Sequence, residues 1–133
     1  MVRLFVLLSG LMGLTGVALG AFGAHGLKNS LGHLEDFPQR IAWWETAAHY
    51  HLIHSLALLG TAFVLTRVSS AAATLAGYAF ALGICLFSGS LYVMTLTGMR
   101  QLGAVTPLGG LCFLLGWACL CIAAYGMTPP PAP

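Results

Sequence analysis

Four long apolar stretches with almost no charge inside them constrain the fold of this chain more than any other feature. Of the 133 residues, 59% are apolar and 6% are charged, whereas about a quarter of the residues in an average soluble domain carry charge. A domain of this size exposes much of its chain, and it needs polar surface to stay in solution. The composition therefore argues against a soluble globular protein, a disordered chain and a protein that binds nucleic acid, and it favours an integral membrane protein.

The lengths of these stretches predict an all-α membrane protein with four transmembrane helices in an up-down bundle, joined by short loops. About 20 apolar residues in a helix cross the hydrocarbon core of a bilayer. Pro38 and the pair Thr106-Pro107 suit helix starts, because the first helical turn does not need the N–H that proline lacks. The expected spans are residues 4–25, 38–66, 71–97 and 107–126 of one domain, residues 1–127, with a proline-rich tail at 128–133.

The first apolar stretch has the features of a signal peptide, with Arg3 before a leucine-rich run and a small-residue cleavage site at residues 18–20. However, its apolar run is longer than such a leader needs, and its glycines recur every three or four residues. Glycines with this spacing share one side of a helix, where they let a neighbouring helix approach closely. We therefore expect a retained span that packs through Gly13, Gly16, Gly20 and Gly23.

Polar side chains gather at one level of the predicted bilayer, next to the loop at residues 26–40, which holds half of the charged residues. If the tryptophans at residues 43–44 mark the membrane interface, His54 lies about 15 Å deeper, near the middle of the membrane. An ionisable group at that depth is a candidate functional residue. The favoured interpretation is a neutral imidazole that forms hydrogen bonds between helices, with Ser88 and Tyr92 as natural partners.

The other titratable side chains at this level have simpler interpretations. Glu45 and His49 share one helix face near the interface, and this position favours contact with water over a buried proton relay. His25 ends the predicted first span, where a protonated imidazole would complement the helix dipole. The spacings of the histidines and of the cysteines match no metal-binding motif, so metal and cofactor remain unknown.

A series of ordered motifs covers nearly the whole chain. They are Gly-Ala-Phe-Gly-Ala-His-Gly-Leu at residues 20–27, Trp43…Thr46…Tyr50…His54, Phe-Ser-Gly-Ser-Leu-Tyr at 87–92, Thr-Pro-Leu-Gly-Gly at 106–110 and Gly-Trp-Ala at 116–118. Together they resemble the YgdD-like inner-membrane proteins, a family of unknown function whose animal relatives are called transmembrane protein 256. The resemblance implies a small four-span protein of the bacterial inner membrane or of mitochondria. It also directs attention to a ligand or interhelical polar site made of His25, Thr46, Tyr50, His54, Ser88 and Tyr92.

Two signals bear on the orientation in the membrane, and they disagree. The basic residues at the two ends of the predicted bundle are Arg3 and Arg67 at one end, and Lys28, Arg40 and Arg100 at the other. Counting them favours the second end as cytoplasmic by one residue. The family resemblance implies the opposite, because relatives end in a basic tail, although this chain has prolines there. We expect both termini to lie in the cytoplasm.

The sequence favours a non-catalytic accessory, assembly or stabilising subunit of a larger membrane complex. A glycine-striped span, short loops and the lack of a catalytic motif support this interpretation. The expected partners are the lipid bilayer and either other membrane subunits or further copies of the chain. The alternative is a membrane protein that binds a haem, a copper ion or a quinone-like lipid at a site around His54, Tyr50, Ser88 and Tyr92. A transporter and an enzyme are less favoured, because four spans enclose little space and the sequence has no nucleophile pattern.

Overall fold

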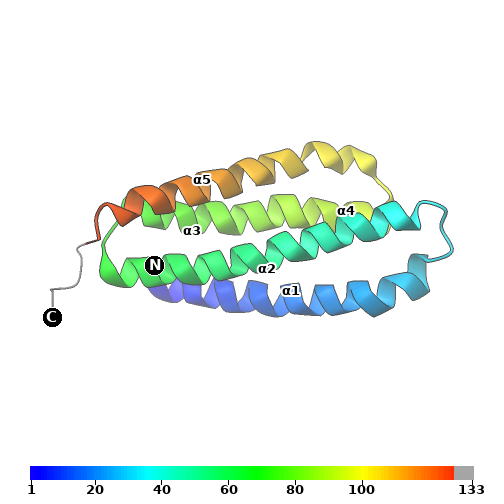
Figure 1. Cartoon of the computed structure of the whole chain (residues 1–133), viewed down its shortest axis with the longest axis horizontal. Helices are drawn as coiled ribbons and strands as arrows, with labels where there is room; N and C mark the ends of the chain where they lie inside the picture. Colours follow the sequence, from blue (N-terminus) through cyan, green and yellow to red (C-terminus); the bar gives the residue numbers. More distant parts are fainter. Residues whose placement is uncertain (128–133) are drawn as a thin grey trace.

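The computed structural model describes residues 1–127 and shows four long helices, each antiparallel to the next (Figure 1). All four are long and apolar enough to cross a membrane. The elements are α1 (Val2–Leu31), α2 (Phe37–Arg67), α3 (Ala71–Gly83), the π-helical turn η1 (Ile84–Ser88), α4 (Gly89–Thr97), the 3₁₀ turn η2 (Arg100–Ala104) and α5 (Thr106–Ala124). Because α3, η1 and α4 form one continuous span, Ala71–Thr97, the predicted all-α bundle of four transmembrane helices is confirmed.

The helix bounds differ from the expected spans mainly in α1. This helix continues past residue 25 to Leu31, so His25 lies inside it rather than at its end. The extension has a packing reason, because the side chain of Leu27 is completely buried. α2 begins and ends one residue outside the range 38–66, and the third span covers 71–97 as expected, while α5 ends at Ala124. The tail at 128–133 lies outside the described residues.

Short connections join the helices and place both described ends of the chain at the same end of the bundle (Figure 1). The Ser70 hydroxyl accepts a hydrogen bond of 3.2 Å from the backbone N–H of Ala73 and so caps the start of α3. Gly98 ends α4 with a positive φ of 74°, a backbone conformation that glycine adopts at little cost. The end with the two other connections, at residues 32–36 and 98–99, is called the loop end below.

Large side chains on one helix lie against glycines on a neighbouring helix. A Cβ atom on any of these glycines would lie under 3.0 Å from the covering side chain, so the helices approach one another as closely as the glycines allow. Such contacts are the usual way in which transmembrane helices associate, because lipid provides little hydrophobic driving force between them. The pairs are Phe5 on Gly77, Leu52 on Gly16, Trp44 on Gly23, Phe80 on Gly116 and Phe113 on Gly83.

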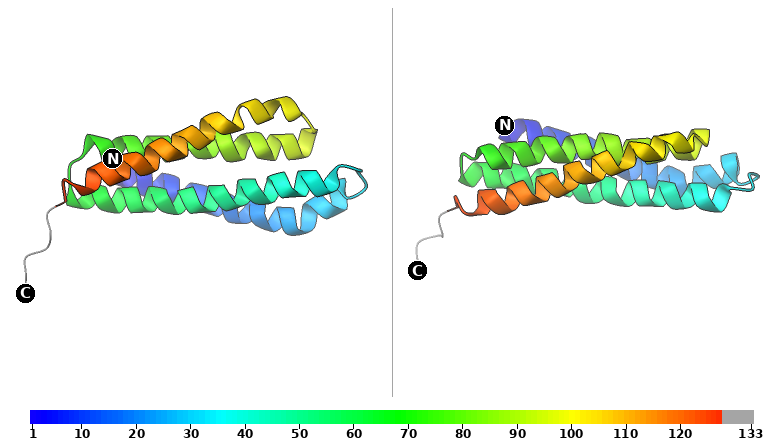
Figure 2. Two further views of the ribbon diagram at one scale, coloured as in Figure 1. Left: turned by 45° about the horizontal axis from the view of Figure 1, so that its top comes forward. Right: turned by 90° about the horizontal axis from the view of Figure 1, so that it is seen from above.

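The four helices do not pack evenly. α1 is the least buried, with 17% of its most apolar segment inside the protein, compared with 56% for the third span. α5 crosses the bundle obliquely, and its separation from α2 widens towards the loop end (Figure 2). At that end Gly109 of α5 lies directly against the backbone of Phe87 in η1. α5 therefore packs on the third span, and an open, wedge-shaped groove lined by side chains of both helices remains between α5 and α2.

Candidate functional site

His54 lies in the interior of the bundle and is held by partners on two helices. Its imidazole is 4% exposed and stacks on the ring of Phe113 in α5, with the ring centroids 3.5 Å apart and the planes at 8°. The Nδ1 atom is 2.8 Å from the carbonyl oxygen of Tyr50, one turn earlier in α2. The Nε2 atom is 3.3 Å from the indole Nε1 of Trp117.

These two hydrogen bonds define which nitrogen of His54 carries the proton. A peptide carbonyl can only accept, so Nδ1 must carry the hydrogen that it donates to Tyr50. An indole N–H can only donate, so Nε2 must be the unprotonated nitrogen that accepts from Trp117. Both ring nitrogens of His54 are therefore used inside the fold, and neither is free to bind a metal.

Tyr50 lies beside His54 but belongs to the surface. Its side chain is 40% exposed, and its ring is nearly parallel to that of His54, at 15°, with a centroid distance of 5.8 Å. The Tyr50 ring also packs on Phe87 at 4.6 Å. Tyr50 and His54 thus form one unit at the edge of the wedge between α2 and α5.

The structure does not pair His54 with Ser88 or Tyr92, which the sequence analysis expected as its partners. Tyr92 lies on the other side of α2, where its hydroxyl is 3.4 Å from Nδ1 of His51. The Nε2 atom of His51 is in turn 3.5 Å from the hydroxyl of Thr15 in α1. The buried His51 therefore connects α1, α2 and α4, in a polar cluster separate from His54.

Ser88 is fully buried at the end of the π turn η1. Its hydroxyl has no hydrogen-bond partner among residues 1–127, and no other buried side-chain nitrogen or oxygen in that range lacks one. π turns interrupt the regular helix and are frequent at functional sites. Ser88 thus forms no hydrogen bond with either histidine cluster.

The remaining expected site residues lie on the surface. His25 and Thr46 are both exposed, and the Thr46 hydroxyl donates to the carbonyl of Ala42 in its own helix, at 2.9 Å. Glu45 and His49 are exposed as well. The structure therefore joins only two of the six residues proposed from the sequence: Tyr50 and His54 contact each other, and none of the other four forms a hydrogen bond with either of them.

The four glycines proposed for packing in α1 also divide into two pairs. Gly16 and Gly23 lie under Leu52 and Trp44 of α2, as described above. A Cβ atom on Gly13 or Gly20 would meet nothing within 4 Å. Two of the four glycines thus pack inside this chain, and two have open space beside them.

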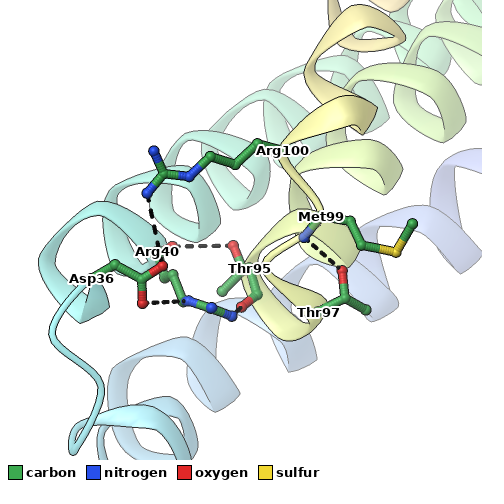
Figure 3. Close-up of polar contacts among 6 residues, drawn as sticks. All are labelled: Asp36, Arg40, Thr95, Thr97, Met99 and Arg100. Atoms are coloured by element: carbon green, nitrogen blue, oxygen red, sulfur yellow. Dashed lines mark hydrogen bonds and ion pairs between the residues drawn. The ribbon is translucent and has the colours of Figure 1, made fainter.

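Arg40 joins α2 to the end of α4 at the loop end (Figure 3). Its Nη1 donates to the carbonyl oxygen of Thr95 at 2.9 Å, and the Thr95 hydroxyl donates to the carbonyl oxygen of Arg40 at 3.1 Å. The guanidinium thereby caps a helix C-terminus, where a positive charge is favourable. Its Nε pairs with Asp36 at 2.8 Å, and this hydrogen bond holds the pKa of the Asp36 carboxyl below its ordinary value of 3.8.

Three residues that hold these clusters were not candidates in the sequence analysis. Trp117 follows Phe113 by one helical turn in α5, so this i, i+4 aromatic pair could have indicated a face that receives a polar side chain. The sequence places His51 on one face of its helix but does not show which helix lies opposite that face, so His51 was not a candidate. Trp44 was expected at the membrane interface, but it is 2% exposed and donates to the carbonyl of Leu19 at 2.8 Å.

The described residues contain no group of three or more His, Cys, Asp or Glu side chains arranged to hold a metal ion. A groove of about 530 Å³ lies between α2 and α5, and a smaller one of about 310 Å³ lies between α1 and the third span. Grooves of this size are in the range that small molecules occupy.

Comparisons with known proteins agree with the membrane fold. The sequence pattern of a family described as "Protein of unknown function (DUF423)" matches residues 19–110. The UPF0382 membrane protein YwdK of Bacillus subtilis is 41% identical over 123 residues, which are 92% of this chain and 96% of YwdK. The UPF0382 inner membrane protein YgdD of Escherichia coli is 39% identical over 122 residues, which are 92% of this chain and 89% of YgdD. No solved structure matches the chain significantly. With a family match over most of its length and relatives at this level of identity, the chain belongs to the DUF423 family of membrane proteins.

Proposed function

We propose that this membrane protein is a non-catalytic accessory subunit of a larger membrane complex, and that α1 contacts the partner. The observation that carries the proposal is a set of glycines on α1 that pack against none of the described residues 1–127: Gly10, Gly13 and Gly20. A glycine inside a helix costs roughly 0.5–1 kcal/mol relative to alanine. Gly16 and Gly23 have a reason to be glycine, because side chains of α2 lie on them. Close packing by a helix of another subunit would explain in the same way why Gly10, Gly13 and Gly20 are glycines.

The position of α1 in the bundle supports this role. α1 is the least buried of the four helices, so much of its surface is available to another protein. Its contacts with α2 hold it in place without covering that surface, since Ser9 donates to the carbonyl of Ser55 at 2.8 Å and Trp44 donates to that of Leu19. A partner could therefore bind to α1 without rearranging the bundle.

The test compares leucine substitutions at three glycines that all have open space. Gly13→Leu and Gly20→Leu place a large side chain on the uncovered face of α1, and Gly60→Leu places the same side chain on an exposed part of α2. Each variant is extracted from its native membrane into lipid nanodiscs, and its folding is checked by circular dichroism. We expect wild type and Gly60→Leu to retain a fixed ratio of the same membrane protein, and the two α1 variants to lose it. Equal retention by all four proteins, or a wild type that is recovered alone, contradicts the proposal.

We also propose that the protein lies in the bacterial inner membrane with both termini in the cytoplasm. The E. coli relative YgdD is named an inner membrane protein, and Met1 and the end of α5 lie at one end of the bundle (Figure 1). Green fluorescent protein fused to either terminus should be fluorescent, because it does not fold when exported to the periplasm as an unfolded chain. Alkaline phosphatase activity from either fusion would place that terminus outside.

A further inference from the structure

Three properties of the groove between α2 and α5 together indicate which kind of ligand it binds. It has a volume of about 530 Å³ and is open along the side of the bundle, because α5 diverges from α2 (Figure 2). In a membrane such an opening faces the lipid, so a ligand can enter it from the bilayer. Its lining includes the side chains of His49, Tyr50, Phe87, Phe113 and Trp117, and Gly110 leaves space among them.

The first property is an unpaired hydroxyl inside the membrane span. Tyr50 lies about 20 Å from the start of α2, at 1.5 Å per residue, which is near the middle of this helix. Its hydroxyl forms no hydrogen bond with any residue in the described range 1–127, whereas the other tyrosine in this part of the bundle, Tyr92, contacts His51. A hydroxyl without a partner in hydrocarbon is costly. A ligand that carries a hydrogen-bond acceptor removes that cost.

The second property is a set of nearly parallel rings. The planes of Tyr50 and His54 differ by 15°, those of His54 and Phe113 by 8°, and those of Tyr50 and Phe113 by 23°. His54 cannot rotate freely, because Tyr50 and Trp117 each form a hydrogen bond with it. A fixed stack with an exposed ring at its edge fits a flat ring in the ligand better than it fits an acyl chain.

The third property is the absence of permanently charged basic side chains from the lining. The groove is lined by no lysine or arginine, and at the loop end Arg40 is engaged with Asp36 and Thr95. A phosphate headgroup would find no lysine or arginine here, so the groove suits an uncharged head.

We propose that this groove binds an isoprenoid quinone. The quinone ring lies against Tyr50, one of its carbonyl oxygens accepts a hydrogen bond from the Tyr50 hydroxyl, and the isoprenoid tail extends along α5 into the bilayer. Tyr50 is the specificity-determining residue, and His54 is a positioning residue that fixes the orientation of the ring stack. Ser88 and Tyr92 are not part of this site. The proposal concerns a different face from the α1 contact surface, so either proposal can fail without the other.

The intrinsic fluorescence of Trp117 provides the binding measurement, because quinones quench tryptophan and Trp117 lines the groove. The protein in detergent is titrated with decylubiquinone. We expect saturable quenching that is absent in Trp117→Phe, since Trp44 is buried against α1 and Trp43 lies outside the groove. Quenching that rises linearly without saturation contradicts the proposal. So does displacement of the quinone by phosphatidylglycerol, because it identifies a phospholipid site instead.

Two variants test the geometry, each with a matched control. Tyr50→Phe removes only the hydroxyl and should weaken decylubiquinone binding by about three- to tenfold, whereas Tyr78→Phe, outside the groove, should not. Gly110→Leu fills the groove, where a Cβ meets no atom closer than 3.9 Å, and should abolish saturable binding, whereas Gly60→Leu should not. Lipid extraction of protein purified from native membranes provides a second readout, and we expect quinone in wild type but not in Gly110→Leu. Wild-type affinity in both groove variants, or extracts that contain only phospholipid, overturns the proposal.

Discussion

The hydrogen bonds of His54 come from one neighbour that the sequence reveals and one that it does not. One neighbour, Tyr50, is in its own helix, and its contact follows from the i, i+4 spacing that the sequence displays. The other, Trp117, is 63 residues away, and no pattern within α2 identifies it. The sequence predicted that His54 is a buried group that forms hydrogen bonds between helices, but the partners it favoured, Ser88 and Tyr92, are not the residue that contacts His54 in the structure, which is Trp117.

The tautomer of His54 is a direct prediction at this scale. In protein labelled with ¹⁵N and held in detergent micelles, the His54 ring should show a proton on Nδ1 and none on Nε2, because Nε2 accepts from Trp117. Trp117→Phe should shift the Nε2 resonance and leave that of Nδ1 nearly unchanged. A proton found on Nε2 in the wild-type protein would be incompatible with the described hydrogen bonds.

Trp117→Phe should also affect stability. The substitution retains an aromatic ring but leaves Nε2 of His54 without its donor, and we expect the free energy of unfolding to fall by about 1–2 kcal/mol. Trp43→Phe is the control, because Trp43 makes no hydrogen bond with another described residue, and its effect should be within about 0.5 kcal/mol. Unfolding in a titration with sodium dodecyl sulfate measures both, and equal effects of the two substitutions would exclude a structural role for the Trp117 contact.

At the scale of elements, the third span explains why the expected site did not form. A helical wheel assumes about 100° per residue throughout, but the π turn Ile84–Ser88 interrupts this span. One extra residue in a helical turn rotates everything after it by about 100°. Tyr92 accordingly contacts His51 on the α1 side, whereas Phe80, before the turn, packs beside His54. No pattern in the sequence indicated the π turn, and Tyr92 was therefore expected beside His54.

The contact between α5 and this π turn depends on Gly109. A Cβ atom there would overlap the backbone of Phe87, which cannot move aside as a side chain end can. Gly109→Ala should therefore destabilise the protein by about 1–3 kcal/mol. Gly110→Ala is the neighbouring control, because a Cβ there would make only an ordinary contact with the Phe87 ring at 3.9 Å, and it should be neutral or slightly stabilising. If thermal unfolding gives both variants the same stability, the described packing of α5 on η1 is wrong.

The Asp36–Arg40 pair at the loop end should make the protein less stable at acid pH. The Arg40 hydrogen bond lowers the pKa of Asp36 below 3.8 in the folded state, so its contribution is present above that pH and is lost as the pH falls through the lowered pKa. The midpoint of thermal unfolding should therefore decrease below about pH 4 in wild type, and this decrease should be smaller in Asp36→Asn. Identical pH profiles for the two proteins would show that the Asp36–Arg40 pair does not contribute.

At the scale of the whole molecule, composition and segment length were enough to predict four antiparallel transmembrane helices. Their arrangement was not predictable in the same way, because packing depends on which side chain meets which glycine. Gly16 and Gly23 are covered and Gly13 and Gly20 are not, although all four belong to the same stripe in the sequence. This difference between equivalent glycines is the basis for placing a partner on α1.

The mass of the particle in its native membrane tests that central claim most directly. The chain has a mass of 13.9 kDa, and native mass spectrometry of nanodiscs cut from the membrane measures what is bound to it. We predict a heavier particle that contains at least one different protein in a constant ratio, and a reduction of this particle to the chain alone in Gly13→Leu and Gly20→Leu but not in Gly60→Leu. A wild-type particle with the mass of the chain alone, or of whole multiples of it, would contradict the assignment as an accessory subunit.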